Sequence, residues 1–204
     1  MNADAIESII RWLGGLLAVF VLGILLYGIW MGSRRQAGRT SGHIWAWFRS
    51  PVFYLISSII FLGLAWLGWI PLPITVSPFA RTLMLVIGSL LFFPGLMLLL
   101  WGRLELGKYY FVSTARGAQL FKDQPLITSG PYAFVRHPMY AGLMLAGLGS
   151  LLIYFTWTAF ISAVIAPLIM LRARREEAAL AEEFGEEWRT YCKRVPAILP
   201  RITR

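Results

Sequence analysis

The chain has 204 residues, of which 58% are hydrophobic and 14% are charged, and its formal net charge is +9. So apolar a composition excludes an ordinary soluble domain and indicates an integral membrane protein. Its single cysteine, Cys192, excludes an internal disulfide and any cysteine-rich metal site, and His43 and His137 are too few and too far apart to indicate a metal centre. We therefore expect no metal.

Four stretches of the chain carry no charged residue, namely 12–33, 50–80, 82–102 and 139–171. Each is long enough to cross the roughly 30 Å hydrocarbon core of a bilayer as a helix. As one helix the last stretch would measure roughly 50 Å, so we expect a hairpin that turns near Phe155, Thr156 and Trp157. The sequence thus predicts an all-α polytopic membrane protein with about five transmembrane helices, the last two forming that hairpin.

Lysine and arginine are concentrated in three of the segments between these stretches. Residues 34–49, 103–136 and 172–204 hold 17 of the 19 basic residues, and only Arg11 and Arg81 lie elsewhere. Because cytoplasmic segments of membrane proteins are enriched in Lys and Arg, five crossings place the N-terminus outside and the C-terminus in the cytoplasm. Membrane topology then explains the positive charge, the basic faces suit anionic lipid headgroups, and we expect no nucleic-acid partner.

The chain is expected to form a single membrane domain, residues 1–204, with two unlike halves. Residues 1–102 hold the three N-terminal transmembrane helices, and residues 103–204 hold the hairpin over 139–171 and the more polar segments. Glycines and prolines punctuate turns between 103 and 138, whereas the tail from Arg172 to Tyr191 is rich in Glu, Arg, Ala and Leu. This tail is predicted to be a cytoplasmic helix, interrupted at Gly185 and ended by Pro196.

Residues 136–140, Arg-His-Pro-Met-Tyr, stand at the start of the predicted hairpin. Pro138 suits the first turn of a helix, whose free backbone N–H groups attract anions. Arg136 and His137 add donors just before that turn, and Tyr140 adds a hydroxyl or an aromatic face. The segment is therefore a candidate site for a carboxylate or a phosphate. The alternative is that Arg136 anchors to lipid phosphate, His137 caps the helix and Tyr140 belongs to the aromatic belt.

Two further polar residues lie at the far end of the hairpin. Arg172 and Glu176 are four residues apart, so they share one helix face, and the hairpin returns that face to the membrane level of His137. A carboxylate beside an anion-binding helix end suits a zwitterion such as an amino acid group. The alternative is an ordinary Arg–Glu helix pair, which we favour for the other glutamates of the tail, Glu182, Glu183, Glu186 and Glu187.

These motifs resemble those of a known family. The run Gly-Pro-Tyr-Ala-Phe-Val-Arg-His-Pro-Met-Tyr over residues 130–140, followed after a hairpin by Arg172, the pair Glu176 and Glu177, Phe-Gly-Glu-Glu-Trp over 184–188 and Tyr191, is similar to the C-terminal half of isoprenylcysteine carboxyl methyltransferases and related phospholipid methyltransferases. The resemblance covers residues 120–200, and the first hundred residues match only as generic membrane helices.

The resemblance implies S-adenosylmethionine as cofactor and a lipophilic or lipid-linked acceptor that enters from the bilayer. By position, Arg172 would be the catalytic residue that orients the acceptor, and Glu176 would bind the amino acid end of the cofactor. The remaining cofactor-binding residues implied by the family are Gln124, Pro125, Leu126, Ile127, Tyr132, His137, Pro138, Met139 and Tyr140.

The resemblance favours carboxyl O-methylation of an isoprenylcysteine-like substrate and leaves three alternatives open. The first is N-methylation of a phospholipid or another small lipid. The second is an NADPH-dependent membrane sterol or enone reductase, because such enzymes carry a similar Arg-His-Pro-x-Tyr motif near a C-terminal hairpin. The third is a non-catalytic membrane scaffold. The acceptor is the least clearly encoded feature, because the helices of residues 1–102 that would shape its pocket carry no motif.

Overall fold

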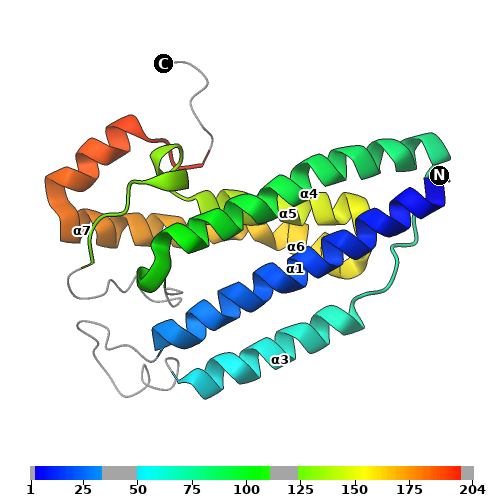
Figure 1. The fold of residues 1–204 in the computed structure, drawn as a ribbon, viewed down its shortest axis with the longest axis horizontal. Coiled ribbons are helices and arrows are strands. Elements are labelled where there is room, and N and C mark those ends of the chain that lie inside the picture. Colours follow the sequence, from blue (N-terminus) through cyan, green and yellow to red (C-terminus); the bar gives the residue numbers. More distant parts are fainter. Residues whose placement is uncertain (1–2, 34–49, 111–123, 199–204) are drawn as a thin grey trace.

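A computed structural model describes residues 3–33, 50–110 and 124–198 and confirms the all-α architecture predicted for a membrane protein (Figure 1). Its elements, in chain order, are α1 (Ala3–Ser33), α3 (Pro51–Leu67), α4 (Pro78–Leu106), η1 (Gly107–Tyr109), η2 (Gly130–Ala133), α5 (Pro138–Tyr154), α6 (Trp157–Ile165), η3 (Ala166–Ile169) and α7 (Met170–Arg194). Among the described residues, three helical segments are long and apolar enough to cross a membrane, and α3 and α5 are shorter apolar helices. The number of crossings stays a prediction.

The two halves of the charge-free stretch 50–80 have different structures. Helix α3 begins after Ser50, whose hydroxyl accepts from the Val52 backbone N–H at 3.2 Å, and it ends at Leu67. A non-helical connection follows, and α4 begins at Pro78 after Ser77, whose hydroxyl accepts from the Ala80 N–H at 3.3 Å. Such caps satisfy backbone donors that the first turn of a helix leaves open. Helix α4 thus begins before the charge-free stretch 82–102.

The predicted hairpin is confirmed. Helix α5 ends at Tyr154, and Phe155 takes a left-handed conformation with φ of 55° before Thr156 caps α6 by accepting from the Ala159 N–H at 3.3 Å. The Leu72 N–H donates to the Phe155 carbonyl at 2.8 Å, so the connection between α3 and α4 lies against the turn. Beyond α6 the chain tightens into η3, which the sequence did not predict, and continues as α7, which contains the predicted helical tail.

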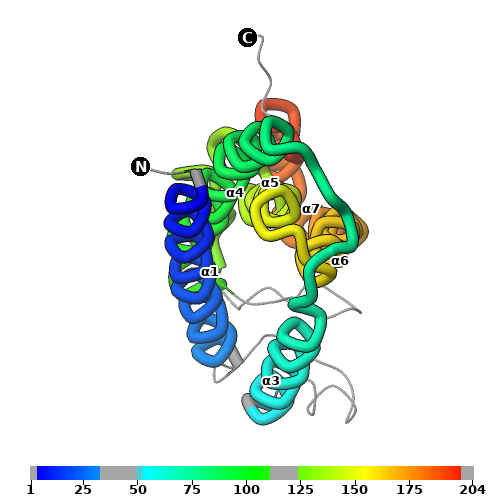
Figure 2. The backbone as a smooth tube through the Cα atoms, turned by 90° about the vertical axis from the view of Figure 1, so that its right-hand side faces the viewer, coloured from blue at the N-terminus to red at the C-terminus, as the bar shows by residue number. Residues whose placement is uncertain are grey.

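Helices α4 and α5 form the centre of the bundle and lie side by side, with α1 alongside α4 and α3 standing apart (Figure 2). Glycines allow the close approach, since a Cβ on Gly95 would lie 2.6 Å from the Ala146 backbone nitrogen and one on Gly142 would lie 2.6 Å from the Gly95 carbonyl oxygen. Small residues serve this purpose in membrane helices. The buried core around this contact comprises Val21, Leu85, Phe92, Leu96, Leu99, Ala146 and Ile153.

The outer surface of the helices is apolar. Trp66 on α3 is 79% exposed and Phe79 at the start of α4 is 80% exposed, and most other residues exposed on α1 and α3 are also large and hydrophobic. Such a surface is unfavourable in water and suits contact with lipid tails. The chain is an integral membrane protein.

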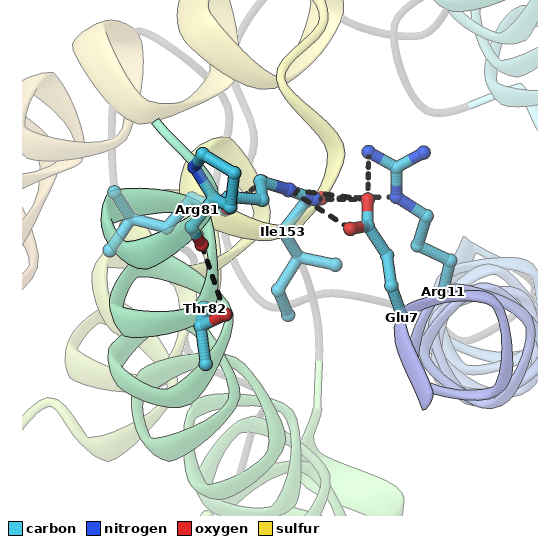
Figure 3. Close-up of polar contacts among 7 residues, drawn as sticks. Glu7, Arg11, Arg81, Thr82 and Ile153 are labelled. Atoms are coloured by element: carbon cyan, nitrogen blue, oxygen red, sulfur yellow. Dashed lines mark hydrogen bonds and ion pairs between the residues drawn. The ribbon is translucent and has the colours of Figure 1, made fainter. Parts of the chain in front are cut away.

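An ion-pair cluster joins α1 to the C-terminal end of α5 (Figure 3). The Arg81 guanidinium pairs with the Glu7 carboxylate at 2.7 Å, and Arg11 pairs with the same carboxylate at 2.8 Å. Arg81 also donates to the carbonyls of Leu152 at 2.8 Å and Ile153 at 2.5 Å. These carbonyls belong to the last turn of α5, which lacks intrahelical partners. Arg11 and Arg81, which the charge count set apart, are therefore structural. We call these three charged residues the Glu7–Arg81 cluster.

Helix α7 bends sharply where the sequence predicts an interruption (Figure 1). Gly185 has φ of 51°, a conformation that glycine adopts readily. The segment after the bend packs through Trp188, Tyr191 and Val195 against Leu126 and the first part of α7. The polar tail thereby folds back over the start of α5.

Candidate active site

The C-terminal segment is fastened to the start of α5. The backbone N–H groups of Arg136 and His137 donate to the carbonyls of Pro196 at 2.8 Å and Ala197 at 2.9 Å. The Arg136 side chain donates to the Val195 carbonyl at 2.9 Å. The sequence left two roles open for Arg136, an anion ligand or an anchor to lipid phosphate. In the structure its guanidinium contacts the protein itself, because the folded-back tail presents the carbonyls of Cys192 and Val195 to it.

The helix end itself offers fewer donors than the sequence predicts. Pro138 has no N–H, and the N–H groups of Tyr140 and Ala141 both donate to the His137 carbonyl, at 3.1 and 3.0 Å. His137 makes no side-chain cap, so the capping role left open for it is not seen. The first turn of α5 therefore satisfies most of its own donors, and polar side chains supply the chemistry of this region.

Glu177 connects α7 to the segment before α5. Its carboxylate oxygen lies 2.8 Å from the Arg136 guanidinium and 2.9 Å from His137 Nε2. The hydrogen bonds from His137 and from Arg136 outweigh burial and hold the pKa of Glu177, in the charged part of α7, below its ordinary value. Glu177 is then ionised at neutral pH, so His137 Nε2 carries the hydrogen in this contact.

Glu176, the next residue back, faces a different partner. The Tyr140 hydroxyl donates to a Glu176 carboxylate oxygen at 2.5 Å. The Tyr140 ring stacks on the His137 ring, with centroids 5.5 Å apart and planes within 6°. The two adjacent glutamates thus have different partners: Glu177 pairs with Arg136 and His137 before α5, and Glu176 accepts a hydrogen bond from Tyr140.

A cavity of about 300 Å³ lies among these residues. It is large enough to hold a small-molecule ligand. The site residues predicted from the sequence that line it are Gln124, Pro125, Leu126, Ile127, Tyr132, His137, Met139, Tyr140, Arg172 and Glu176. Two distant motifs, the start of α5 and the first turn of α7, therefore meet at one cavity, as the hairpin predicts.

Pro138 is the predicted site residue that the structure places outside the cavity wall. It is fully buried, and a Cβ on Gly102 would lie 3.3 Å from Pro138 Cγ. Its rigid ring starts α5 and packs against α4 rather than facing a ligand. The structure thus gives Pro138 a role in helix placement, and its contact with a cofactor stays a prediction.

The cavity has walls that the sequence did not identify. Tyr109 and Tyr110, which follow α4, both line it. Arg136 also lines the cavity, and the other additional lining residues are apolar or aromatic: Leu25, Leu99, Leu106, Leu143, Ile169, Leu180, Trp188 and Tyr191. A lone leucine on a membrane helix carries no signal, but Trp188 and Tyr191 belong to the motifs quoted above.

Two tyrosines hold the wall of the cavity in place. The Tyr191 hydroxyl donates to the Tyr132 carbonyl at 2.6 Å, and the Tyr132 hydroxyl donates to the Gly102 carbonyl at 3.3 Å. These bonds connect the folded-back tail to η2 and η2 to α4. Burial raises the pKa of Tyr132, so its phenol remains a neutral donor.

Comparison with known proteins gives the family. A family model for phospholipid methyltransferases matches residues 83–187, which contain α5, α6 and the cavity residues Arg172, Glu176 and Leu180 of α7. The architecture and the cavity describe a polytopic membrane protein with a ligand site at one end of a helical hairpin. The chain belongs to the phospholipid methyltransferase family, which confirms the family resemblance of its motifs.

Individual relatives agree with this assignment. The chain is 41% identical over 83 residues to a protein-S-isoprenylcysteine O-methyltransferase of Schizosaccharomyces pombe, covering 40% of this chain and 35% of that protein. It is 32% identical over 167 residues to the cobalt-zinc-cadmium resistance protein CzcN of Cupriavidus metallidurans, covering 80% and 66%. It is 27% identical over 164 residues to a methanethiol S-methyltransferase of Pseudomonas deceptionensis, covering 74% and 59%. The chain thus spans about a third of the first relative.

Proposed function

We propose that this protein is a membrane methyltransferase that uses S-adenosylmethionine and acts on a lipophilic acceptor, with carboxyl O-methylation of an isoprenylcysteine-like substrate as the favoured reaction. The observation that carries the proposal is the meeting of Glu176, Tyr140 and Arg172 at one cavity whose remaining wall is largely apolar and aromatic. Family membership supports methyl transfer. The relatives named as methyltransferases differ in acceptor, since one name gives O-methylation of an isoprenylcysteine protein and another gives S-methylation of methanethiol.

The chemistry of the lining residues fits the cofactor. Glu176 supplies a carboxylate for an ammonium group, and Tyr140 adds a hydroxyl at 2.5 Å from it. Leu126 and Ile127 add an apolar surface, and the ring of His137 adds a planar one. When bound, S-adenosylmethionine supplies an electrophilic methyl group, whose transfer to a carboxylate breaks the sulfur–carbon bond, forms an oxygen–carbon bond and requires no base.

Arg172 suits the acceptor side of the same reaction. It stands one turn before Glu176 on α7 and lines the cavity. A guanidinium binds a carboxylate through directed hydrogen bonds, and alignment in a dry site is the main contribution that a protein can make to a methyl displacement. An amine acceptor would require a base, and His137 Nε2 is occupied by Glu177. These features favour a carboxylate acceptor.

The halves of the domain have different proposed roles. Residues 103–204 carry the polar lining residues, whereas Leu25 and Leu99 bring α1 and α4 of residues 1–102 into the cavity wall. The apolar end of the cavity suits an acceptor that enters from the bilayer. The positive charge of the segments 34–49, 103–136 and 172–204 supports a cytoplasmic C-terminus and an outside N-terminus.

A labelling experiment tests the proposal. The purified protein is incubated with methyl-labelled S-adenosylmethionine and a total extract of lipids and membrane proteins, and the product is treated with base. Label released as methanol is the expected result, because it identifies a carboxyl ester. Base-stable label would instead indicate N- or S-methylation, as in the phospholipid alternative. Absence of label together with NADPH binding would favour the reductase, and absence of both would favour the scaffold.

A further inference from the structure

A buried arginine lies beside the cavity and has no place in the function proposed above. Arg103, on the last turns of α4, is 9% exposed. Its Nη1 donates to the Gly107 carbonyl at 3.1 Å, whereas its buried Nε has no hydrogen-bond partner among the described residues. Burying a polar N–H without a partner is costly, and charged groups within membrane helices commonly mark functional sites.

Stability does not explain this arginine. Arg81 and Arg136, whose side chains are 17% and 14% exposed, each pair with a glutamate. Arg103 forms no ion pair with any carboxylate in residues 3–33, 50–110 and 124–198. Glu105, two residues further along, accepts instead from the Ser129 hydroxyl. Removing a cation from water without an anion beside it opposes folding.

Helix α1 and Tyr110 shape a slot for the guanidinium. The Arg103 guanidinium carbon lies 4.3 Å from the centroid of the Tyr110 ring. A Cβ on Gly28 of α1 would lie 2.5 Å from Arg103 Nε and 2.7 Å from Tyr110 Cδ1. Only a glycine at position 28 leaves room for this arrangement, so three elements combine to hold the cation in place.

Tyr110 links this slot to the cavity. The ring lines the cavity and is itself 8% exposed. Burial raises the pKa of Tyr110 to about 12, against the lowering effect of two nearby cations, Arg103 and Arg172. The phenol is therefore neutral at physiological pH and does not neutralise either guanidinium. The positive charge of Arg103 remains beside this end of the cavity.

We infer that Arg103 is a positioning residue that fixes Tyr110 and, together with Arg172, makes this end of the cavity selective for a lipophilic acceptor with an anionic headgroup. That the ligand is a methyl acceptor rests on the proposed function. The selectivity for an anionic headgroup concerns binding alone and does not depend on methyl transfer. The attraction of Arg103 and Arg172 would stabilise a carboxylate bound near Tyr110, because charges interact strongly across a low-dielectric wall. A neutral headgroup of the same size would not be stabilised in this way.

The test compares binding of two amphiphiles to the full chain in detergent micelles. The probes are N-acetyl-S-farnesylcysteine and its primary amide, which differ in charge at the headgroup and share the same lipid tail. Dissociation constants are measured by calorimetry for the wild type, Arg103→Gln, Arg103→Lys and Gly28→Ala. Arg174→Gln, which removes an exposed cation from α7, is the matched control.

We expect the wild type and Arg174→Gln to bind the acid about tenfold more tightly than the amide. Arg103→Gln is expected to reduce this ratio to about two, and Arg103→Lys to retain about half of it, because a lysine keeps the charge and loses the flat contact with Tyr110. Gly28→Ala displaces the guanidinium with its charge intact and should also lower the ratio, which keeps the inference testable if Arg103→Gln does not fold.

Two results would overturn the inference. One is equal affinity of the wild type for acid and amide, and the other is an unchanged ratio in Arg103→Gln and Gly28→Ala. A merely structural role would weaken both probes alike and leave the ratio unchanged. Failure of the methyltransferase proposal is recognised separately, by the absence of S-adenosylmethionine binding and of label transfer in the wild type.

Discussion

Charged residues contact helix α5 at both of its ends, and their roles differ between the two ends. At the C-terminal end, Arg81 pairs with Glu7 and donates to two α5 carbonyls. At the N-terminal end, Glu177 pairs with Arg136 and His137, while the adjacent Glu176 meets Tyr140 at the wall of a cavity. A carboxylate paired with cations that also hold backbone carbonyls stabilises the fold. For the carboxylate at the cavity wall beside a phenol, Glu176, we propose a role in ligand recognition.

The largest expected effect comes from breaking the Glu7–Arg81 cluster. Arg81→Ala leaves two α5 carbonyls and Glu7 without their main donor, so we expect a loss of about 3 kcal/mol of stability. For a chain of this size the melting temperature would fall by roughly 6–12 °C. Thermal unfolding in detergent measures this change.

Arg11→Ala is the matched control for that experiment. The Arg11 side chain is 41% exposed, so its pair with Glu7 is screened and is expected to contribute less than about 1 kcal/mol. Below the melting temperature, the affinity of Arg81→Ala for S-adenosylmethionine is expected to equal that of the wild type. A loss of affinity in the folded variant would show that this cluster also serves the cavity.

The next effect concerns turnover. Arg172→Ala removes the guanidinium proposed to align the acceptor, so the turnover number is expected to fall about a hundredfold. The dissociation constant of S-adenosylmethionine should change by less than about threefold, since Glu176 remains. Steady-state kinetics and equilibrium binding separate the two. A large loss of cofactor affinity with normal turnover of the bound enzyme would reverse the roles assigned to Arg172 and Glu176.

A smaller and pH-dependent effect is expected at Glu177. Its pKa lies below the ordinary value of 4.5, so its stabilising contribution is complete above pH 4.5 and is lost as the pH falls through the lowered pKa. Glu177→Gln should therefore have a free energy of unfolding about 1 kcal/mol below that of the wild type at neutral pH. This difference should shrink in acid, and thermal or denaturant unfolding across a pH series measures it.

Glu186→Gln provides the comparison for this pH series, because the Glu186 pair with Arg189 has both side chains about two-thirds exposed. It should change stability little at any pH. A Glu177→Gln deficit that stays constant down to acid pH would mean that the ionised carboxylate is not the source of the stability.

The elements that the sequence predicts correctly are those set by local patterns. The turn at Phe155 follows from the length of an apolar stretch that exceeds one crossing, and the bend in α7 follows from Gly185 in an otherwise helical tail. The meeting of Tyr140 with Glu176 follows from the hairpin together with motif spacing. Neighbouring residues determine the first two features, and the predicted hairpin brings together the two residues of the third.

The features that the sequence missed depend on distant contacts. The engagement of Arg136 by the Val195 carbonyl requires the tail to fold back, which no spacing rule encodes. The family resemblance implied a cofactor contact for Pro138, and no local pattern predicted that its ring packs toward Gly102. The space that Gly28 of α1 leaves for Arg103 of α4 depends on contact between helices far apart in sequence. A glycine in a membrane helix is common, so its presence alone did not predict this contact.

The division between the two adjacent glutamates is tested most directly by equilibrium dialysis of labelled S-adenosylmethionine against the wild type, Glu176→Gln and Glu177→Gln, each shown to be folded. The cavity position of Glu176 predicts at least about a tenfold loss of affinity in Glu176→Gln and less than about a threefold loss in Glu177→Gln. Equal affinity of Glu176→Gln and the wild type would contradict the assignment of this cavity to the cofactor.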